Sequence, residues 1–187
     1  MMDPIVKEFI EKHKSKWIVH KWKDYGPEGN QRLYELLHVK GLSIKEILGL
    51  GYELEAVEVI HGNVLLNEGI QLLEDIILGL DTTSPKWDSS NAHLGVGDGT
   101  TAEDASQTGL QGSNKAYKGM DAGYPTRSNQ TMTWRSTFGD TEANFSWNEF
   151  TVANGSDDSA TNLNRKVESK GTKSGGNWTL TLQITIS

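Results

Sequence analysis

The chain of 187 residues contains no cysteine, which excludes disulfide scaffolds, thiolate metal sites and cysteine nucleophiles. It has no run of about 18 apolar residues, so no membrane-spanning helix is expected. Met1–Ile10 lacks the continuous apolar core of a signal peptide. Apolar residues make up only 35% of the chain, a low share for a soluble domain. Six tryptophans partly compensate, because each ring buries a large apolar area.

Basic residues are also scarce, and the formal net charge is −7. Residues 1–80 and 81–187 are both net negative, so neither has the basic excess expected of a nucleic-acid-binding domain. The exception is the first 23 residues, which hold six lysines against three acidic residues. This run fits a solvated helix face, and it also fits a local contact with an acidic partner.

A change in composition near residue 80 predicts an α+β fold, with a helical N-terminal region followed by an antiparallel β sandwich or barrel. Residues 1–50 are expected to form a helical or extended arm, or an anchoring region. Residues 51–80 are expected to form a strand and an amphipathic helix that link to the β domain. Residues 81–187, rich in Gly, Ser, Thr, Asn and Asp, are expected to be that domain.

Helix signals begin at Asp3-Pro4, which is typical of a helix start, with Ile5, Val6, Phe9 and Ile10 on one face. Lys16–Lys23 alternates loosely, which fits a short strand or an extended arm ended by Tyr25-Gly26-Pro27. Gln31–Val39 is predicted to be helical. Ser43 and Glu46 then have the spacing of a capping box, which satisfies free amides at a helix start.

The 51–80 segment contains a strand and the clearest helix of the chain. Tyr52–His61 alternates as a strand, and its change of parity predicts a β-bulge near Ala56. Asn67–Leu80 has helical periodicity. Its expected apolar stripe consists of Leu66, Ile70, Leu73, Ile76, Ile77 and Leu80.

After residue 90 the pattern becomes one of short strands. They are predicted at 92–96, 115–120, 131–138, 145–152 and 163–167, with a long polar loop at 97–112. The last strand, Trp178–Ile186, is the most regular, with apolar side chains on one face and Thr or Gln on the other. We expect it to lie in a core, paired within the domain or with a neighbouring subunit.

No motif of catalysis or cofactor binding is complete. Gly95-Val-Gly-Asp-Gly99 lacks the lysine and the following helix of a phosphate-binding loop, so a strand ending in a glycine turn is favoured. Asp98, Glu103 and Asp104 offer oxygen ligands for calcium without EF-hand spacing. Asp157-Asp158 fits a solvated loop tip. The five histidines, His13, His20, His38, His61 and His93, have no zinc-site spacing.

One candidate enzyme site remains. Glu142 and Glu149 could serve as the carboxylate pair of a glycosidase. They lie close in sequence to Phe145, Trp147 and Phe150, which fit either a sugar-stacking platform or a packed core, and the core is favoured. We therefore expect no catalytic, cofactor-binding or metal-binding residues.

Several blocks, taken in order, resemble structural proteins of tailed phage particles. The similarity covers about residues 56–187. The blocks are Gly62–Leu80, Ala92–Ala102, Gln107–Leu110, Thr131–Phe138, Glu142–Glu149, Leu163–Val167 and Trp178–Leu182. The chain departs from the common tail-fibre version at Glu149-Phe-Thr-Val152, where that version has Glu-x-Gly-Leu-Phe.

The resemblance implies a non-enzymatic virion component that is made in the host cytoplasm and docks onto major capsid or tail subunits. We expect a homo-oligomer in a symmetric assembly, without nucleic acid or membrane, and we favour a head-surface decoration protein. The alternatives are a tail, collar or fibre protein, or a carbohydrate-binding module for host surfaces. The candidate assembly contacts are Phe9, Trp17, Trp22, Trp178, Leu180, Leu182, Ile184 and Ile186.

Overall fold

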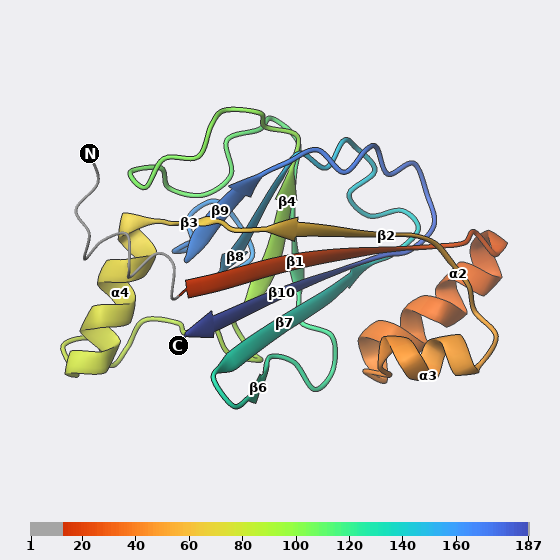
Figure 1. The fold of residues 1–187 in the computed structure, drawn as a ribbon, viewed down its shortest axis with the longest axis horizontal. Helices are drawn as coiled ribbons and strands as arrows, with labels where there is room; N and C mark the ends of the chain where they lie inside the picture. The colour runs from red at the N-terminus through yellow and green to blue at the C-terminus, as the bar shows by residue number, and fades with distance from the viewer. Residues whose placement is uncertain (1–12, 187) are drawn as a thin grey trace.

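The computed structural model describes residues 13–186, and its main feature is a pair of five-stranded antiparallel sheets (Figure 1). Sheet A has the order β2-β1-β10-β7-β6, and sheet B has the order β3-β9-β8-β4-β5. The strands of sheet A are β1 (His13–Trp22), β2 (Leu54–His61), β6 (Thr126–Ser128), β7 (Thr131–Phe138) and β10 (Trp178–Ile186). Those of sheet B are β3 (Val64–Leu65), β4 (His93–Gly97), β5 (Lys115–Gly119), β8 (Glu149–Ala153) and β9 (Asn164–Val167).

Helices lie at the two ends of this pair of sheets. At one end α2 (Gly26–Tyr34), the π-helical turn η1 (Glu35–Val39) and α3 (Ile44–Gly49) form a unit that we call the cap. At the other end lies α4 (Asn67–Leu78). None of the helices in the described part of the chain is long and apolar enough to cross a membrane.

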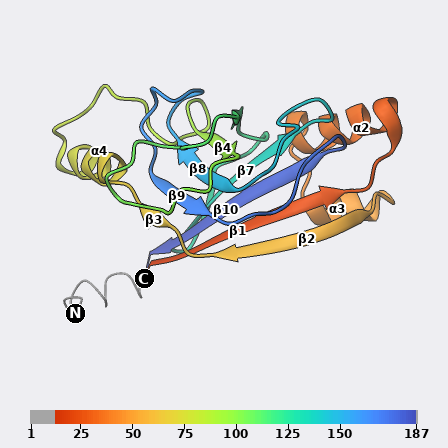
Figure 2. The ribbon, with the colours of Figure 1, turned by 90° about the horizontal axis from the view of Figure 1, so that it is seen from above.

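The two sheets face each other across one apolar core (Figure 2). Trp17 and Leu182 contribute to it from sheet A, and Leu94 and Phe150 contribute from sheet B; all four are fully buried. Burial of such side chains stabilises a fold by about 1.5–3 kcal/mol each before entropy is subtracted. The expected antiparallel β architecture is therefore confirmed, with two layers.

The last strand was predicted correctly, but its neighbours belong to this chain. β10 pairs with β1 from Trp178 to Ile186 and with β7 from Trp178 to Thr185. Both of its edges are therefore occupied, and a strand of another subunit has no free edge of β10 to join.

The N-terminal region differs most from expectation. The fold-class prediction made the N-terminal region helical, but the first described element is a strand, β1, which lies in the sheet between β2 and β10. It covers most of Lys16–Lys23, whose alternation fitted either a short strand or an extended arm. Trp17 and Val19 point into the core while Ile18 and His20 face outward, so a period of two decides the conformation. Residues 13–22 are thus part of sheet A and do not form a separate arm. The helix expected from Asp3-Pro4 lies outside the described residues.

In the cap, most of the helices predicted from local sequence signals are present. Helix α2 begins at Gly26, before the predicted start, because Pro27 occupies its first turn, a position without need of an amide donor. The capping box is present, with Ser43 accepting from the Glu46 amide and Glu46 accepting from the Ser43 amide. Beneath the cap lies a second apolar cluster, centred on Trp22, Leu33, Leu37 and Ile47.

Two further details follow from the register. A bulge interrupts the pairing of β1 with β2, where Lys21 faces Ala56 and Trp22 faces Leu54, as predicted near Ala56. The segment 145–152 is not one strand, since β8 begins only at Glu149. Trp147 precedes it and is held by the carbonyl of Gly171.

Candidate functional site

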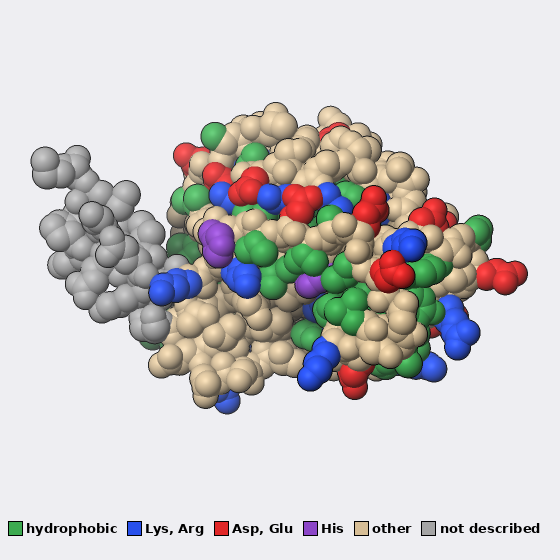
Figure 3. Space-filling view, turned by 45° about the vertical axis from the view of Figure 1, so that its right-hand side comes forward, with side chains coloured by type: hydrophobic (Ala, Val, Ile, Leu, Met, Phe, Trp, Pro, Cys, Tyr) green, Lys and Arg blue, Asp and Glu red, His purple; other side chains and the backbone are tan. Residues whose placement is uncertain are grey.

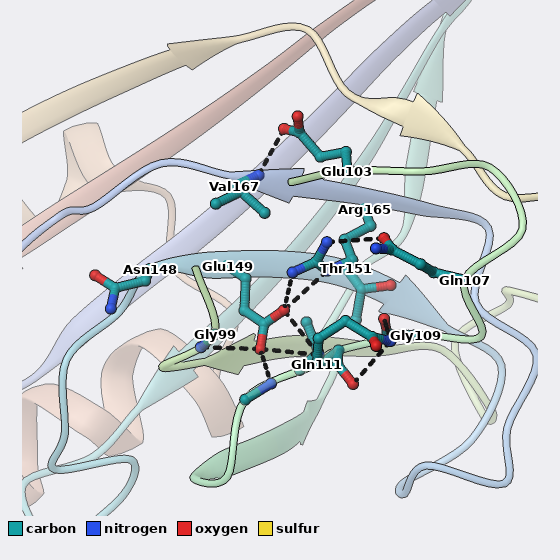
Figure 4. A network of polar contacts seen from close by, with 12 residues as sticks. Gly99, Glu103, Gln107, Gly109, Gln111, Asn148, Glu149, Thr151, Arg165 and Val167 are labelled. Atoms are coloured by element: carbon teal, nitrogen blue, oxygen red, sulfur yellow. Dashed lines mark hydrogen bonds and ion pairs between the residues drawn. The ribbon is translucent and has the colours of Figure 1, made fainter. Parts of the chain in front are cut away.

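The most connected polar group in the described residues is the carboxylate of Glu149, which is fully buried at the start of β8 (Figure 4). It accepts hydrogen bonds from the backbone amides of Gly99, Gln111 and Gly112 at 3.1, 2.9 and 2.6 Å. The guanidinium of Arg165 in β9 pairs with it at 2.7 Å and also donates to the side chain of Gln107 at 2.8 Å. Glu149 therefore anchors the long loop 98–112 against sheet B.

The glycines that superficially suggested a phosphate loop serve this anchor. A Cβ atom on Gly97 would lie 2.4 Å from the Oε1 atom of Glu149, and one on Gly99 would lie 2.5 Å away. No real Cβ approaches so closely, so the buried carboxylate requires glycine at both positions. The structural interpretation of this motif, a strand ending in a glycine turn, is confirmed.

Glu142 is bound to different partners. Its carboxylate accepts from the Nζ atom of Lys118 at 2.6 Å and from the Gly139 amide at 2.7 Å, and Lys118 also donates to the Tyr34 hydroxyl. Burial raises the pKa of Glu142, but the hydrogen bonds from Lys118 and Gly139 outweigh burial and bring the pKa below its usual range. Both carboxylates of the suggested glycosidase pair thus neutralise a neighbouring cation.

The aromatic residues beside these carboxylates lie in the core. Trp147 and Phe150 are fully buried, and Phe145 packs against the same cluster. Trp147 makes edge contacts with Phe138 and Trp178, each at a centroid distance of 4.9 Å. Trp147 and Phe150 are therefore not exposed for stacking on a sugar, and Phe145 is half-buried against the same core, so the prediction of core packing is confirmed.

The suggested oxygen ligands for calcium are directed to separate partners. Asp98 accepts from the side chain of Asn114, Glu103 accepts from the Val167 amide, and Asp104 accepts from Ser106. Asp157 caps the Ser159 turn, while exposed Asp158 accepts from Lys115 and Tyr117. Within residues 13–186 no three histidine or acidic side chains are grouped closely enough to hold a metal ion.

A second buried ionic cluster joins the cap to sheet A. Asp121 accepts from Arg135 at 2.7 Å and from the amide and hydroxyl of Thr137 at 2.8 and 2.9 Å, and it also contacts the His38 ring at 2.8 Å. Arg135 also donates to the Leu37 carbonyl. Because Leu37 and His38 belong to η1, this cluster fixes the cap on the sheet.

Lys173 is the third buried polar group of note. Its ammonium donates to the Gly139 carbonyl at 2.7 Å and to the Asn144 side chain at 2.9 Å. Burial lowers the pKa of Lys173 to about 8. The three carbonyl oxygens around it hold the loop 139–144 in place.

The candidate assembly contacts do not form a surface. Six of the eight are buried in the interior and stabilise the fold: Trp17, Trp22, Trp178, Leu180, Leu182 and Ile184. Ile186 is 45% exposed at the end of β10. Phe9 lies outside the described residues. The alternation that made these side chains conspicuous is the signature of a core strand, and that is where the described ones lie.

Sequence reasoning missed an exposed apolar surface on α4. Leu72 packs into the core and Ile76 contacts it, whereas Ile77, Leu78 and Leu80 are 73%, 69% and 73% exposed and Leu73 is 37% exposed. Leu73, Ile77 and Leu80 were expected on the buried stripe. The sequence did contain a signal for this surface: α4 has more apolar residues than one face of a twelve-residue helix can bury.

Comparison with known proteins adds no relative: no family model, no curated protein and no solved structure matches this chain.

Proposed function

We propose that this chain is a non-enzymatic structural protein of a tailed-phage virion, which docks onto other virion subunits as a decoration or stabilising protein on the head surface. The phage assignment rests on the sequence blocks described above. Those blocks coincide with elements of the fold: β4, β7, β9 and the first half of β10 each lie within or largely within one. The resemblance therefore concerns residues that build the two sheets.

The observation that carries the docking role is the exposed apolar face of α4. Soluble proteins rarely leave several large aliphatic side chains together on one surface, and such patches mark interaction sites. Here Ile77, Leu78 and Leu80 are more exposed than buried, although the same chain buries all six of its tryptophans. A protein that exposes this surface gains stability when a partner covers it.

Rigidity of the fold supports the same role. The long loop 98–112 is held by Glu149 and Arg165, and the cap is held by Asp121 and Arg135. Buried ion pairs of this kind fix one arrangement of loops and helices. A subunit repeated many times in a particle needs the same surface in every copy, because weak contacts then add up over the assembly.

The test is the location of the protein in purified particles. Virions would be examined by cryo-electron microscopy and by labelling with antibody-bound gold, with the protein identified in the particles by peptide mass spectrometry. We expect density for the two sheets on the head surface at a regular, symmetric spacing. Labelling of the tail, collar or fibre instead would change the proposed location on the virion. Complete absence of the protein from particles would overturn the proposal.

A further inference from the structure

Two surfaces near the same end of the molecule carry opposite charge beside exposed apolar side chains. The first is the outer part of α4 and its end, formed by Leu73, Glu74, Ile77, Leu78 and Leu80, which we call the α4 surface. The second lies on the outer face of sheet A, where β1 and β2 run side by side (Figure 3). It is formed by Lys14, Lys16, Val57, Val59 and His61, and we call it the sheet surface.

The α4 surface is apolar and acidic. Between Lys45 and Lys86 the chain has no Lys or Arg, while α4 contains Glu68, Glu74 and Asp75, and Asp81 follows shortly after it. Glu74 is exposed beside the three most exposed aliphatic side chains. The helix dipole adds negative partial charge at this C-terminal end. A partner of the α4 surface must therefore be apolar with a basic rim.

The α4 surface is also held rigidly. Leu66 donates to the Leu163 carbonyl, and the Glu68 carboxylate accepts from the Asn162 amide at 2.8 Å. A Cβ atom on Gly69 would lie 2.5 Å from the Cα atom of Leu163, so the helix packs directly on the backbone before β9. At its end the Leu80 amide donates to the Asp75 carbonyl, and Gly79 is left-handed. Little ordering entropy is lost when a partner binds such an element.

The sheet surface has the opposite composition. Lys14 and Lys16 of β1 lie on this face, whereas Lys21 lies on the opposite face and pairs with Glu58. The register places Lys16 opposite His61 and Ile18 opposite Val59, so basic and apolar side chains share one face. Val57 and Val59 are 50% and 41% exposed. Figure 3 shows hydrophobic side chains beside lysine and histidine side chains on this face.

The sheet surface is also hollowed. A depression of about 390 Å³ is lined by Lys14, Ser15, Lys16, His61, Gly62, Gln183 and Thr185. Along the adjacent edge of β2 the charges are paired, with Glu58 contacting both Lys21 and Lys170. Charged edges discourage strand pairing, so the face, and not the edge, is the surface open to a partner.

We infer that the partner of the α4 surface is the sheet surface of a second copy of this chain. The aliphatic side chains at the end of α4 lie against Val57 and Val59, and Glu74 lies against Lys14 and Lys16 beside the depression. This inference deepens the proposed assembly role and rests on it, since it names the first subunit with which the protein associates.

Charge reversal tests the contact. We expect Lys16→Glu and Glu74→Lys each to weaken self-association of the full-length chain at least about tenfold in sedimentation equilibrium, because each opposes like charges. The double variant restores association. A mixture of the two single variants forms a complex that neither forms alone, because each supplies the unaltered surface that the other lacks.

Cross-linking through introduced cysteines locates the contact. Because the natural chain has no cysteine, only the introduced thiols can react. Ile77→Cys and Val59→Cys chains would be mixed and treated with a short bis-maleimide, which adds to one thiol on each chain. We expect the mixed product to exceed the product of either chain alone. Leu48→Cys on α3 is the matched control, since Leu48 is a similarly exposed aliphatic residue at the opposite end, and it should not cross-link to Cys at position 77 above background.

Three results would overturn this inference. The first is a monomer at every concentration, and the second is self-association that neither charge reversal weakens. The third is self-association that is lost when residues 1–12 are removed but persists in the two charge-reversal variants. The third result would assign the α4 surface to the N-terminal segment. Each leaves the proposed virion role intact if particles contain the protein. Self-association as inferred, with no protein in particles, would instead remove the virion role and keep the contact.

Discussion

The two helical regions treat their apolar side chains in opposite ways. The cap buries Leu33, Leu37 and Ile47 over Trp22 and is tied to sheet A by Asp121 and Arg135. Helix α4 buries Leu72 but leaves Ile77, Leu78 and Leu80 largely exposed. Both regions are apolar enough to require cover. The cap receives it from its own sheet, and we propose that α4 receives it from another subunit.

The largest effect is expected when the cap loses the buried carboxylate of Asp121, which holds it on sheet A. Asp121→Asn leaves Arg135 buried without its counter-charge, and we expect the free energy of unfolding to fall by about 3–5 kcal/mol. Urea denaturation followed by tryptophan fluorescence measures the loss. Glu28→Gln, an exposed acidic residue in α2, is the control and should change stability by less than about 0.5 kcal/mol. Equal effects of the two substitutions would show that the cluster does not hold the cap.

The next effect concerns the apolar contact under the cap. Leu37 is fully buried, so Leu37→Ala should cost about 2–4 kcal/mol through lost burial and the cavity that remains. Val39, two residues later in the same turn, is 62% exposed, and Val39→Ala should cost less than about 0.5 kcal/mol. Thermal unfolding of both variants in calorimetry tests the contrast. A small loss for Leu37→Ala would mean that the cap is not part of the cooperative core.

A smaller effect, dependent on pH, is expected at His20, on the outer face of sheet A opposite Val57 and Thr179. Burial, with the nearby charges of Arg135 and Lys16, lowers the pKa of His20 from 6.5 to about 4. Between about pH 4 and pH 6.5 the His20 ring therefore stays neutral in the folded state, whereas in the unfolded state it binds a proton. The stability that His20 contributes is complete above about pH 6.5 and is lost as the pH falls toward 4.

We expect His20 to account for a loss of about 1–2 kcal/mol over this range, less than the full shift because the ring is partly exposed to solvent. His20→Gln should remove that part of the pH dependence, measured by urea denaturation at pH 7.0 and pH 4.5. His61→Gln is the control on the exposed end of β2. An unchanged pH dependence in His20→Gln would contradict the assignment.

The smallest effect is predicted on α4. Ile77→Ser removes an exposed aliphatic side chain, so the stability of the isolated monomer should stay within about 0.5 kcal/mol of the parent. Leu72→Ser, on the buried face of the same helix, should lower the melting temperature markedly. Thermal melts at low protein concentration compare the two. A large loss for Ile77→Ser would place that side chain in a contact within the monomer.

Local signals in the sequence were reliable wherever one rule decided the conformation. The capping box at Ser43 and Glu46, the bulge near Ala56 and the strand at Trp178–Ile186 were all predicted. The periodicity of apolar residues did not decide the conformation of a segment where that conformation depends on which strands pair with it. The alternation in Lys16–Lys23 fitted a strand or an arm, and only pairing with β10 and β2 selects the strand.

The candidate site was predicted less well for the same reason. Glu149 was noticed as a carboxylate, but its partners Arg165 and Gln111 are distant in sequence, so its anchoring role was not visible. The assembly contacts were assigned to the most hydrophobic strand positions, which became core. The exposed surface was placed on the wrong residues because helical periodicity gives the apolar faces of α4 but not the side on which the sheets lie.

The sequence by itself determined that this protein is built mainly of antiparallel strands around tryptophan and aliphatic side chains, because alternation and turn residues act locally. Only the tertiary structure decided which apolar residues are interior and which remain on the surface. That choice depends on contacts between segments far apart in the chain, such as β1 with β10 and α4 with Leu163, and an exposed Ile77 has the same local sequence signal as a buried one.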